Sequence, residues 1–180
     1  MIVTGRVKVV RHADTGDVIL EIFGAGETVG AVAVYNRVPY PATALVMEPS
    51  VLLRLPRAEW FDLIEHDPGF SRGMMLELTR LNMSLTRKLA AMHGTRVDAR
   101  IAGLFLSLAE RMGRTTEAGI EIPMALSRQE IAELVGTTVE SAIRVMSRWN
   151  REGVLVTARE RFVIPDRDKL RAEANVRDDS

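Results

Sequence analysis

The sequence contains no cysteine. Without thiols the chain forms no disulfide, no cysteine-ligated zinc site and no cysteine-ligated iron–sulfur cluster. Strictly apolar stretches are short, so no membrane-spanning segment and no membrane partner are expected. The N-terminal sequence MIVTGRVKVV lacks a basic region followed by an apolar core and a cleavage site, so a signal peptide is not expected either. Together these absences predict a cytoplasmic protein.

An excess of charge of one sign is also missing, because 24 Lys and Arg residues balance 24 Asp and Glu residues. A global positive field is therefore excluded, and any contact with DNA has to come from locally placed arginines. No set of nucleophile, base and acid is recognisable, so the chain is not expected to be an enzyme. The three histidines, His12, His66 and His93, are scattered, and we interpret them as surface or structural residues. No cofactor or metal is predicted.

The first third of the chain has the pattern of short strands. Residues 2–10 and 17–23 are rich in β-branched residues, and 42–47 and 51–55 follow with glycine and proline between them. Strands of this length and spacing are typical of a barrel or jelly roll. We therefore expect a sensor domain with a β-roll over residues 1–66.

Helical patterns follow over 56–65 and, for a longer helix, over 70–92. On the long helix, leucines recur at the a/d spacing of a coiled-coil seam, so a dimerisation helix and hinge are predicted over 67–94. A helix packed on its own domain is the alternative, but a narrow stripe on a long helix favours the dimer. The predicted interface residues are Leu78, Leu81, Leu85, Leu89 and Met92.

The remainder, 95–180, has the pattern of a compact helical unit with a β-hairpin. The expected elements are helices over 97–112, 128–135 and 139–151, a short strand over 121–123, and a hairpin formed by 154–157 and 161–164. The charged tail from Asp166 is expected to fray.

Two capping-box patterns lie ten residues apart, at Ser127–Glu130 and at Thr137–Glu140, with Gly136 between them. Two helix starts this close, joined by a glycine turn, are typical of a helix-turn-helix. In such a motif the first helix crosses the DNA backbone and the second enters the major groove.

One face of the second helix carries Glu140, Ile143 and Arg144, which we predict to read bases. An arginine can bond a guanine edge with two hydrogen bonds, and a glutamate can accept from a cytosine amino group. The alternative for this face is a solvated surface, and Glu140 has a competing role as the second residue of a capping box. The predicted DNA-backbone contacts are Thr138, Ser147, Arg148 and Arg151.

Four segments carry a resemblance to a known family: GRVKVV at 5–10, VILEIFGAGETVG at 18–30, YPATA at 40–44 and the long stretch 126–155. With these the chain resembles the cyclic-AMP receptor protein / FNR family of bacterial transcription regulators. The resemblance implies an α+β fold with a cyclic-nucleotide-binding-like jelly roll, a long dimerisation helix and a C-terminal winged helix-turn-helix. It also implies a homodimer that binds a palindromic promoter site on double-stranded DNA and contacts RNA polymerase. The family's base-reading glutamate and arginine map onto Glu140 and Arg144.

The sequence departs from the family in the nucleotide pocket. The family's Gly-Glu pair appears as Gly30–Ala31, and Pro41–Ala42 occupies the place of its Arg-Ser/Thr pair. The polar pair on the dimerisation helix appears as Leu85–Thr86. A cyclic phosphate would lose its charged partners, so cyclic AMP is not expected to bind. The effector is unknown; an iron–sulfur cluster is excluded and haem, which some members bind, is kept as an alternative. The degenerate pocket comprises Gly30, Ala31, Pro41, Ala42, Thr43 and Thr86.

The family pattern also places one or two strands and a helix before Met1, so we expect a shortened roll with open edges or exposed apolar surface. The sequence as a whole predicts a DNA-binding transcription regulator that does not respond to cyclic AMP. One alternative is a small-molecule sensor whose DNA domain is vestigial, which the intact Glu140/Arg144 pair argues against. Another is a constitutive DNA binder without an effector.

Overall fold

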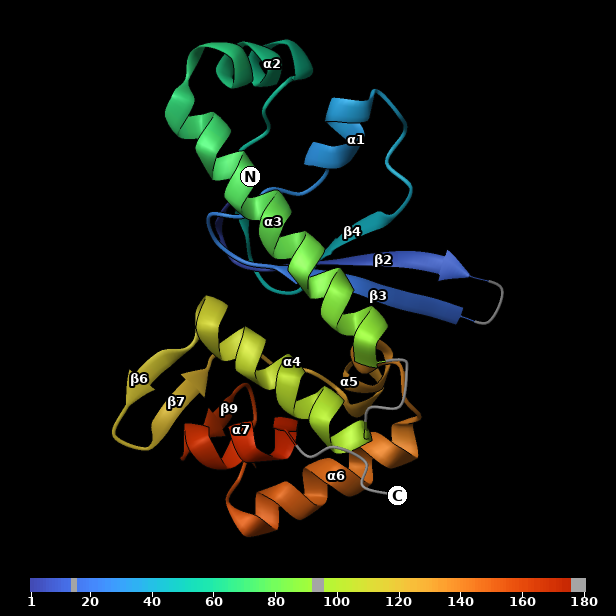
Figure 1. Cartoon of the computed structure of the whole chain (residues 1–180), viewed down its shortest axis with the longest axis vertical. Helices are drawn as coiled ribbons and strands as arrows, with labels where there is room; N and C mark the ends of the chain where they lie inside the picture. The colour runs from blue at the N-terminus through green and yellow to red at the C-terminus, as the bar shows by residue number, and fades with distance from the viewer. Residues whose placement is uncertain (14–15, 92–95, 176–180) are drawn as a thin grey trace. The chain divides into compact units, whose positions relative to one another are not determined.

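The computed structural model of the chain describes residues 1–13, 16–91 and 96–175 (Figure 1). The chain divides into two compact units, residues 1–87 and 88–180. Both units combine strands with helices. This mixed architecture is the α+β fold predicted from the sequence, whereas the three-part division of the chain stays a prediction.

The N-terminal unit holds two small antiparallel sheets. A three-stranded sheet has the order β3-β2-β4 and a two-stranded sheet pairs β1 with β5. The strands are β1 Ile2–Thr4, β2 Val7–Ala13, β3 Gly16–Phe23, β4 Thr43–Val46 and β5 Val51–Leu52. The single strand predicted over 2–10 is two strands, because Gly5 has a φ of 88° and a Cβ at that position would collide with Ser50. Only glycine adopts this conformation readily.

The core of this unit lies between the strands and the long helix. Ile2, Val7, Val9 and Phe23 form one buried cluster. The partly buried side chains Val29, Ala42 and Leu81 pack against it. Successive side chains of a strand point to opposite sides, so Val7 and Val9 of β2 lie on the same side and both enter the cluster.

Three helices complete the unit: α1 Ala31–Asn36, α2 Arg57–His66 and α3 Pro68–Ala91. The short α1 was not expected from the sequence. The long helix begins at Pro68, two residues before the predicted start at 70, and the missing N–H of proline costs nothing at a first helical position. None of the helices in the described ranges is both long and apolar enough to cross a membrane.

An aromatic cluster joins these helices. Trp60 on α2 is buried, and its ring lies 6.1 Å from that of Tyr35, 5.1 Å from that of Phe61 and 6.3 Å from that of Phe70. All three pairs have edge-to-face geometry, which stabilises the contact between the rings in addition to the stabilisation from burying their apolar area.

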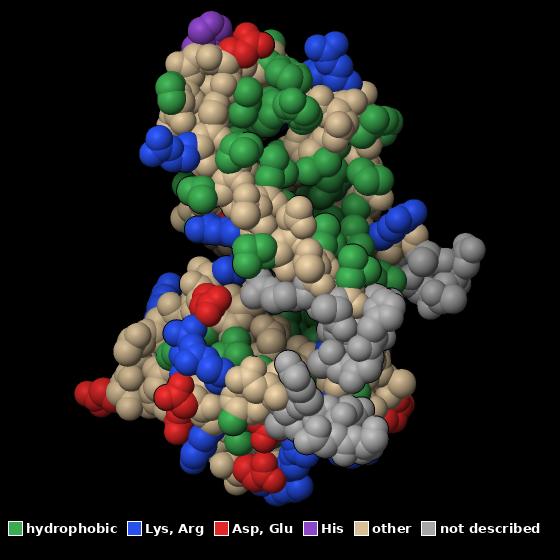
Figure 2. All heavy atoms as spheres, viewed as in Figure 1, with side chains coloured by type: hydrophobic (Ala, Val, Ile, Leu, Met, Phe, Trp, Pro, Cys, Tyr) green, Lys and Arg blue, Asp and Glu red, His purple; other side chains and the backbone are tan. Residues whose placement is uncertain are grey.

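Apolar side chains are also exposed on the N-terminal unit, and Figure 2 shows many of them on the face turned to the viewer. Val46 at the end of β4 is 61% exposed, and the β5 segment adds Val51, Leu52 and Leu53, each more than half exposed. Exposed apolar side chains also occur on β1 and β3, such as Val3 and Leu20, so they are not confined to one edge of the unit.

The described part of the C-terminal unit combines four helices with a four-stranded sheet of order β6-β7-β9-β8. Its elements are α4 Val97–Met112, β6 Arg114–Thr116, β7 Gly119–Ile122, α5 Arg128–Val135, α6 Val139–Glu152, β8 Val156–Thr157, β9 Phe162–Ile164 and α7 Arg167–Asn175. The fully buried side chains of Phe105, Trp149 and Phe162 mark the core, and the rings of Phe105 and Phe162 lie 4.8 Å apart. The predicted hairpin is present as β8 and β9.

The expectation that the tail frays from Asp166 is wrong for residues 167–175, which form α7 and contact α4. The Asp166 carboxylate accepts hydrogen bonds from the backbone N–H groups of Asp168 and Lys169, which caps the helix start. Leu170 is completely buried, and Arg167 forms an ion pair of 2.7 Å with Glu110 on α4. One apolar anchor and a cap therefore order a segment of otherwise polar composition.

Candidate nucleic-acid interface

The first helix of the predicted helix-turn-helix begins with the capping box expected at Ser127. The Ser127 hydroxyl accepts from the Glu130 N–H at 3.1 Å, and the Glu130 carboxylate accepts from the Ser127 N–H at 2.9 Å. The helix ends at Gly136, whose φ of 66° lies in the left-handed region. The chain turns here toward the second helix.

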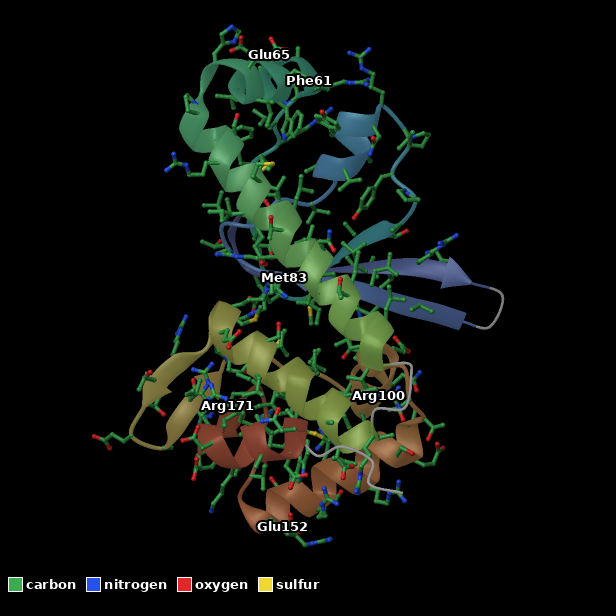
Figure 3. The ribbon with its side chains drawn as sticks, in the orientation of Figure 1. Phe61, Glu65, Met83, Arg100, Glu152 and Arg171 are labelled. Carbon is green, nitrogen blue, oxygen red and sulfur yellow. The ribbon has the colours of Figure 1, made fainter. Side chains whose placement is uncertain are left out.

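Arg100 on α4 fixes the end of α5 (Figure 3). One guanidinium nitrogen, Nη1, donates to the carbonyl oxygens of Val135 at 3.0 Å and Gly136 at 2.7 Å. These carbonyls have no partner within the helix, and a cation is favoured at this negative end of the helix dipole. Sequence reasoning missed Arg100, because no local pattern shows which distant carbonyl an arginine reaches.

The second helix, α6, begins at Val139 as predicted, but its N-cap lies one residue later than the capping-box pattern indicated. Thr138 is its N-cap, and the Thr138 hydroxyl accepts from the Ser141 N–H at 3.2 Å. The capping box predicted at Thr137–Glu140 is therefore wrong, and Glu140 has no role in capping. The Glu140 side chain is exposed and has no hydrogen bond or ion pair with the described part of the chain.

Two opposite faces of α6 differ sharply in character. Ala142, Val145, Met146 and Trp149 are buried against the rest of the unit. The opposite face exposes the three predicted base-reading residues and two of the predicted backbone contacts: Glu140, Ile143, Arg144, Ser147 and Arg151. Within residues 1–13, 16–91 and 96–175, neither Arg144 nor Arg151 has a carboxylate partner.

Arg148 lies in different surroundings from the other predicted DNA contacts. Its guanidinium lies 3.1 Å from the Asp98 carboxylate, 3.3 Å from that of Glu173 and 3.7 Å from that of Glu152. Burial lowers the pKa of Arg148, but the Asp98 hydrogen bond and the nearby negative charges outweigh it and raise the pKa. This arginine joins α6 to α4 and α7, so its contact with a phosphate stays a prediction that competes with a structural role.

The hairpin after α6 is tied to both helices of the motif through Thr157. The Thr157 hydroxyl accepts from Arg128 at 3.1 Å, and its N–H donates to the Asn150 side chain at 2.9 Å. Burial lowers the pKa of Arg128. The wing is therefore held at a fixed position beside α5 and α6, which the sequence alone did not reveal.

The predicted effector-pocket residues fall on three segments of the N-terminal unit. Gly30 is the N-cap of α1 with a φ of 90°, and Ala31 is its first residue. Pro41 and Ala42 lead into Thr43, the first residue of β4.

None of these residues, nor Thr86 on α3, carries a charge. Ala42 packs against the buried cluster, and the Thr43 hydroxyl lies 3.4 Å from His12 Nε2. The Thr86 hydroxyl donates to the carbonyl oxygen of Asn82 one turn earlier, at 3.0 Å. The six predicted pocket residues therefore supply neither a guanidinium for a phosphate nor a carboxylate for a ribose.

The predicted dimer seam divides between two sides of α3. Leu78, Leu85 and Leu89 are exposed by 43%, 59% and 61%. Leu81 instead packs against the buried cluster of its own unit, which differs from the predicted contact with a partner. Leu81 follows Leu78 by three residues, so it lies about 60° further round the helix, toward the strands. Met92 lies outside the described residues.

The histidines of the described ranges do not converge. His12 lies near Thr43, and the His66 ring contacts the carboxylate of Asp62, which precedes it by one helical turn. His93 falls outside the described residues. No group of three or more residues able to hold a metal ion occurs in the described part of the chain.

Comparison with known proteins matches both units to described families. Residues 1–67 match the model of the cyclic nucleotide-binding domain, and residues 99–173 match that of the Crp-like helix-turn-helix domain. The CRP-like cAMP-activated global transcriptional regulator of Mycobacterium tuberculosis is 25% identical over 175 residues, covering 97% of this chain and 78% of that protein. The fumarate and nitrate reduction regulatory protein of Salmonella typhi is 24% identical over 172 residues, covering 95% and 68%.

A solved structure shares the fold over nearly the whole chain. It is a transcriptional regulator of the CRP/FNR family from Thermus thermophilus, with a TM-score of 0.75 and 20% identity, covering 98% of this chain and 87% of that one. The two units therefore occur together, in this order, in proteins of known fold.

Proposed function

Because the chain belongs to the CRP/FNR family of transcription regulators, we propose that it recognises one specific DNA sequence through the exposed face of α6. The observation that carries this proposal is the pairing of Glu140 and Arg144 on that face, one turn apart and both without partners in the described part of the chain. Charged side chains that are held on a rigid helix, and are not neutralised by neighbours, are available to bond base edges.

The neighbouring residues have separate roles in the proposal. Arg144 bonds the O6 and N7 atoms of a guanine, and Glu140 accepts from a cytosine amino group. Thr138, Ser147 and Arg151 contact the DNA backbone, which fixes the register of α6 without reading sequence. Arg100 acts as a positioning residue, since it holds the turn from which α6 starts.

We further propose that the chain works as a homodimer on a palindromic promoter site. The exposed leucines of α3, Leu78, Leu85 and Leu89, support this, because an apolar stripe at a/d spacing is stabilised when a second helix covers it. Two copies related by a two-fold axis place two α6 helices on half-sites with the same symmetry. Contact with RNA polymerase is part of the same proposal and rests on family membership.

Cyclic AMP is not the signal in this proposal. The relative in M. tuberculosis is described as cAMP-activated. Here Ala31, Pro41 and Ala42 occupy the places of the family's charged and polar contacts, and a cyclic phosphate without a charged partner would pay for its desolvation. The effector, if one exists, therefore has different chemistry.

Selection of bound duplexes from a random DNA pool tests the proposal. The wild-type chain should enrich an inverted repeat, and Arg144→Ala should enrich no motif or one degenerate at a single base pair of each half-site. Parallel selections with and without extracted cell metabolites would report whether a ligand changes affinity. A pool without any enriched motif, or the same motif from both chains, would contradict the assignment of α6.

A further inference from the structure

Ile143 is an exception in the C-terminal unit. Across the described residues 96–175, it is the only large apolar side chain that is exposed, at 46%. The other large apolar side chains of α6, Val145, Met146 and Trp149, are buried. A single exposed apolar side chain is common on protein surfaces. Ile143, however, lies on the face that carries Glu140 and Arg144, so a partner bound there covers it, and an apolar group of that partner stabilises the complex.

The surroundings of Ile143 indicate which group that is. It lies on the same face as Glu140, three residues earlier, and beside Arg144, so it reaches the same surface as the two charged side chains. On the major-groove edges of the four base pairs, the C5-methyl group of thymine is the only apolar feature. A protein surface is a poor alternative, because an unpartnered carboxylate and an unpartnered guanidinium would be buried next to the isoleucine.

We propose that Ile143 recognises the 5-methyl group of a thymine in each half-site, next to the base pair that Arg144 reads. This inference rests on the proposed DNA recognition by α6 and adds one base to it. The contact is apolar, so it selects thymine by its methyl group and is indifferent to the hydrogen-bonding groups that thymine shares with uracil.

Single thymine-to-deoxyuridine replacements test the inference directly, because they remove one methyl group and keep every hydrogen-bonding group. Each thymine of the duplex selected by the wild-type chain is replaced in turn, symmetrically in both half-sites, and affinity is measured by fluorescence anisotropy at fixed salt. One position should lose affinity about four-fold per half-site, hence about fifteen-fold overall, as expected for one buried methyl group. Ile143→Ala should bind the thymine and deoxyuridine duplexes at that position equally, and Ile143→Val should show an intermediate ratio.

Two further arms separate the methyl group from other causes. Cytosine and 5-methylcytosine at the same position should differ by the same factor with the wild-type chain and not with Ile143→Ala. Thermal unfolding of Ile143→Ala should match wild type, since the side chain is exposed. A deoxyuridine scan without effect, or an effect that persists in Ile143→Ala, would overturn the inference and leave the proposed function standing. A selection that enriches no motif would overturn both.

Discussion

Arg144 and Arg148 lie one turn apart on α6, and their surroundings differ. The first is exposed and has no carboxylate partner in the described ranges, whereas the second lies within 4 Å of three carboxylates. Arg148 therefore holds the helix in its own unit, whereas Arg144 is free of carboxylate partners in the described ranges for the DNA contact that we propose.

Arg144→Ala should remove base discrimination without unfolding the unit. We expect a loss of about 1–3 kcal/mol per half-site on the selected duplex, because one two-hydrogen-bond contact to guanine disappears. Anisotropy titrations against the selected and a scrambled duplex measure this, with thermal unfolding as the check on folding. Arg151→Ala is the matched control, since loss of a phosphate contact should weaken both duplexes alike and reduce the salt dependence of binding. Retained preference for the selected duplex in Arg144→Ala would refute the base-reading role.

Arg148→Met should act on stability. Glu173 would lose this cation, and Asp98 would keep only Arg96 at 3.6 Å, so we expect a loss of about 1 kcal/mol in the free energy of unfolding, a modest value because the Arg148 side chain is 36% exposed. Urea unfolding measures the loss, and Arg144→Met provides an exposed control without carboxylate partners. A double-mutant cycle with Asp98→Asn should show coupling between the two residues. Additive effects would show that the ion pair contributes nothing.

At the scale of elements, α3 presents a stripe whose orientation can be tested. Leu78 and Leu85 are exposed on one side, and Leu76 and Met83 are exposed about 160° round the helix. Leu78→Glu with Leu85→Glu should give monomers in sedimentation velocity, since four carboxylates would meet at a two-fold interface. Leu76→Glu with Met83→Glu, equally exposed on the same helix, should remain dimeric. Dimers in the first variant, or monomers only in the second, would place the interface elsewhere.

A polar contact joins α3 to the segment between β3 and α1 and makes stability depend on pH. The Glu77 carboxylate accepts from the Thr28 N–H at 2.6 Å, and burial raises the pKa of Glu77. An acid with a higher pKa in the folded state binds more protons when folded, so its contribution to stability falls as the pH rises through its titration range.

Glu77→Gln keeps the acceptor oxygen and removes the charge. The variant should therefore melt at or above the temperature of wild type at pH 7, and the difference should disappear near pH 4, where the unfolded carboxyl is also becoming protonated. Thermal unfolding at both pH values measures this. A variant that melts lower only at pH 7 would show that the buried charge itself stabilises the contact.

The elements that sequence predicted best are those with local signals. The bounds of α4 and α5 agree with the prediction, because an apolar stripe, a capping box and a terminal glycine mark α5 within its own sequence. The same logic placed the cap of α6 one residue early, at Thr137, since two adjacent threonines offer the same hydroxyl and the structure uses that of Thr138.

The elements that sequence missed depend on distant contacts. α1 is six residues long and begins after a left-handed glycine, so it has too few turns to show a periodicity. α7 has one buried anchor, Leu170, within a polar stretch that resembles a disordered tail. At the site, sequence predicted which face of α6 is exposed, but it could not separate Arg148 from Arg144, because the carboxylate partners Asp98 and Glu173 lie far away in the chain.

For the whole molecule, the question is whether the N-terminal unit still binds the ligand of its family. The unit matches the cyclic nucleotide-binding domain, yet the positions expected to hold the nucleotide carry Ala31, Pro41 and Ala42. Fold and ligand are separable, since the fold depends on apolar residues such as Val7, Val9 and Phe23, and the ligand depends on a few charged ones.

Cyclic AMP at millimolar concentration should therefore leave the melting temperature of the chain unchanged. A ligand present at about 100 times its dissociation constant stabilises the folded state by about 2.7 kcal/mol, a shift of several degrees in a unit of this size. The selected DNA duplex is the positive control, because it should raise the melting temperature in the same assay by binding the C-terminal unit. A clear rise with cyclic AMP would show that backbone groups and uncharged side chains suffice to hold the phosphate, and the degenerate pocket would then be a functional one with different contacts.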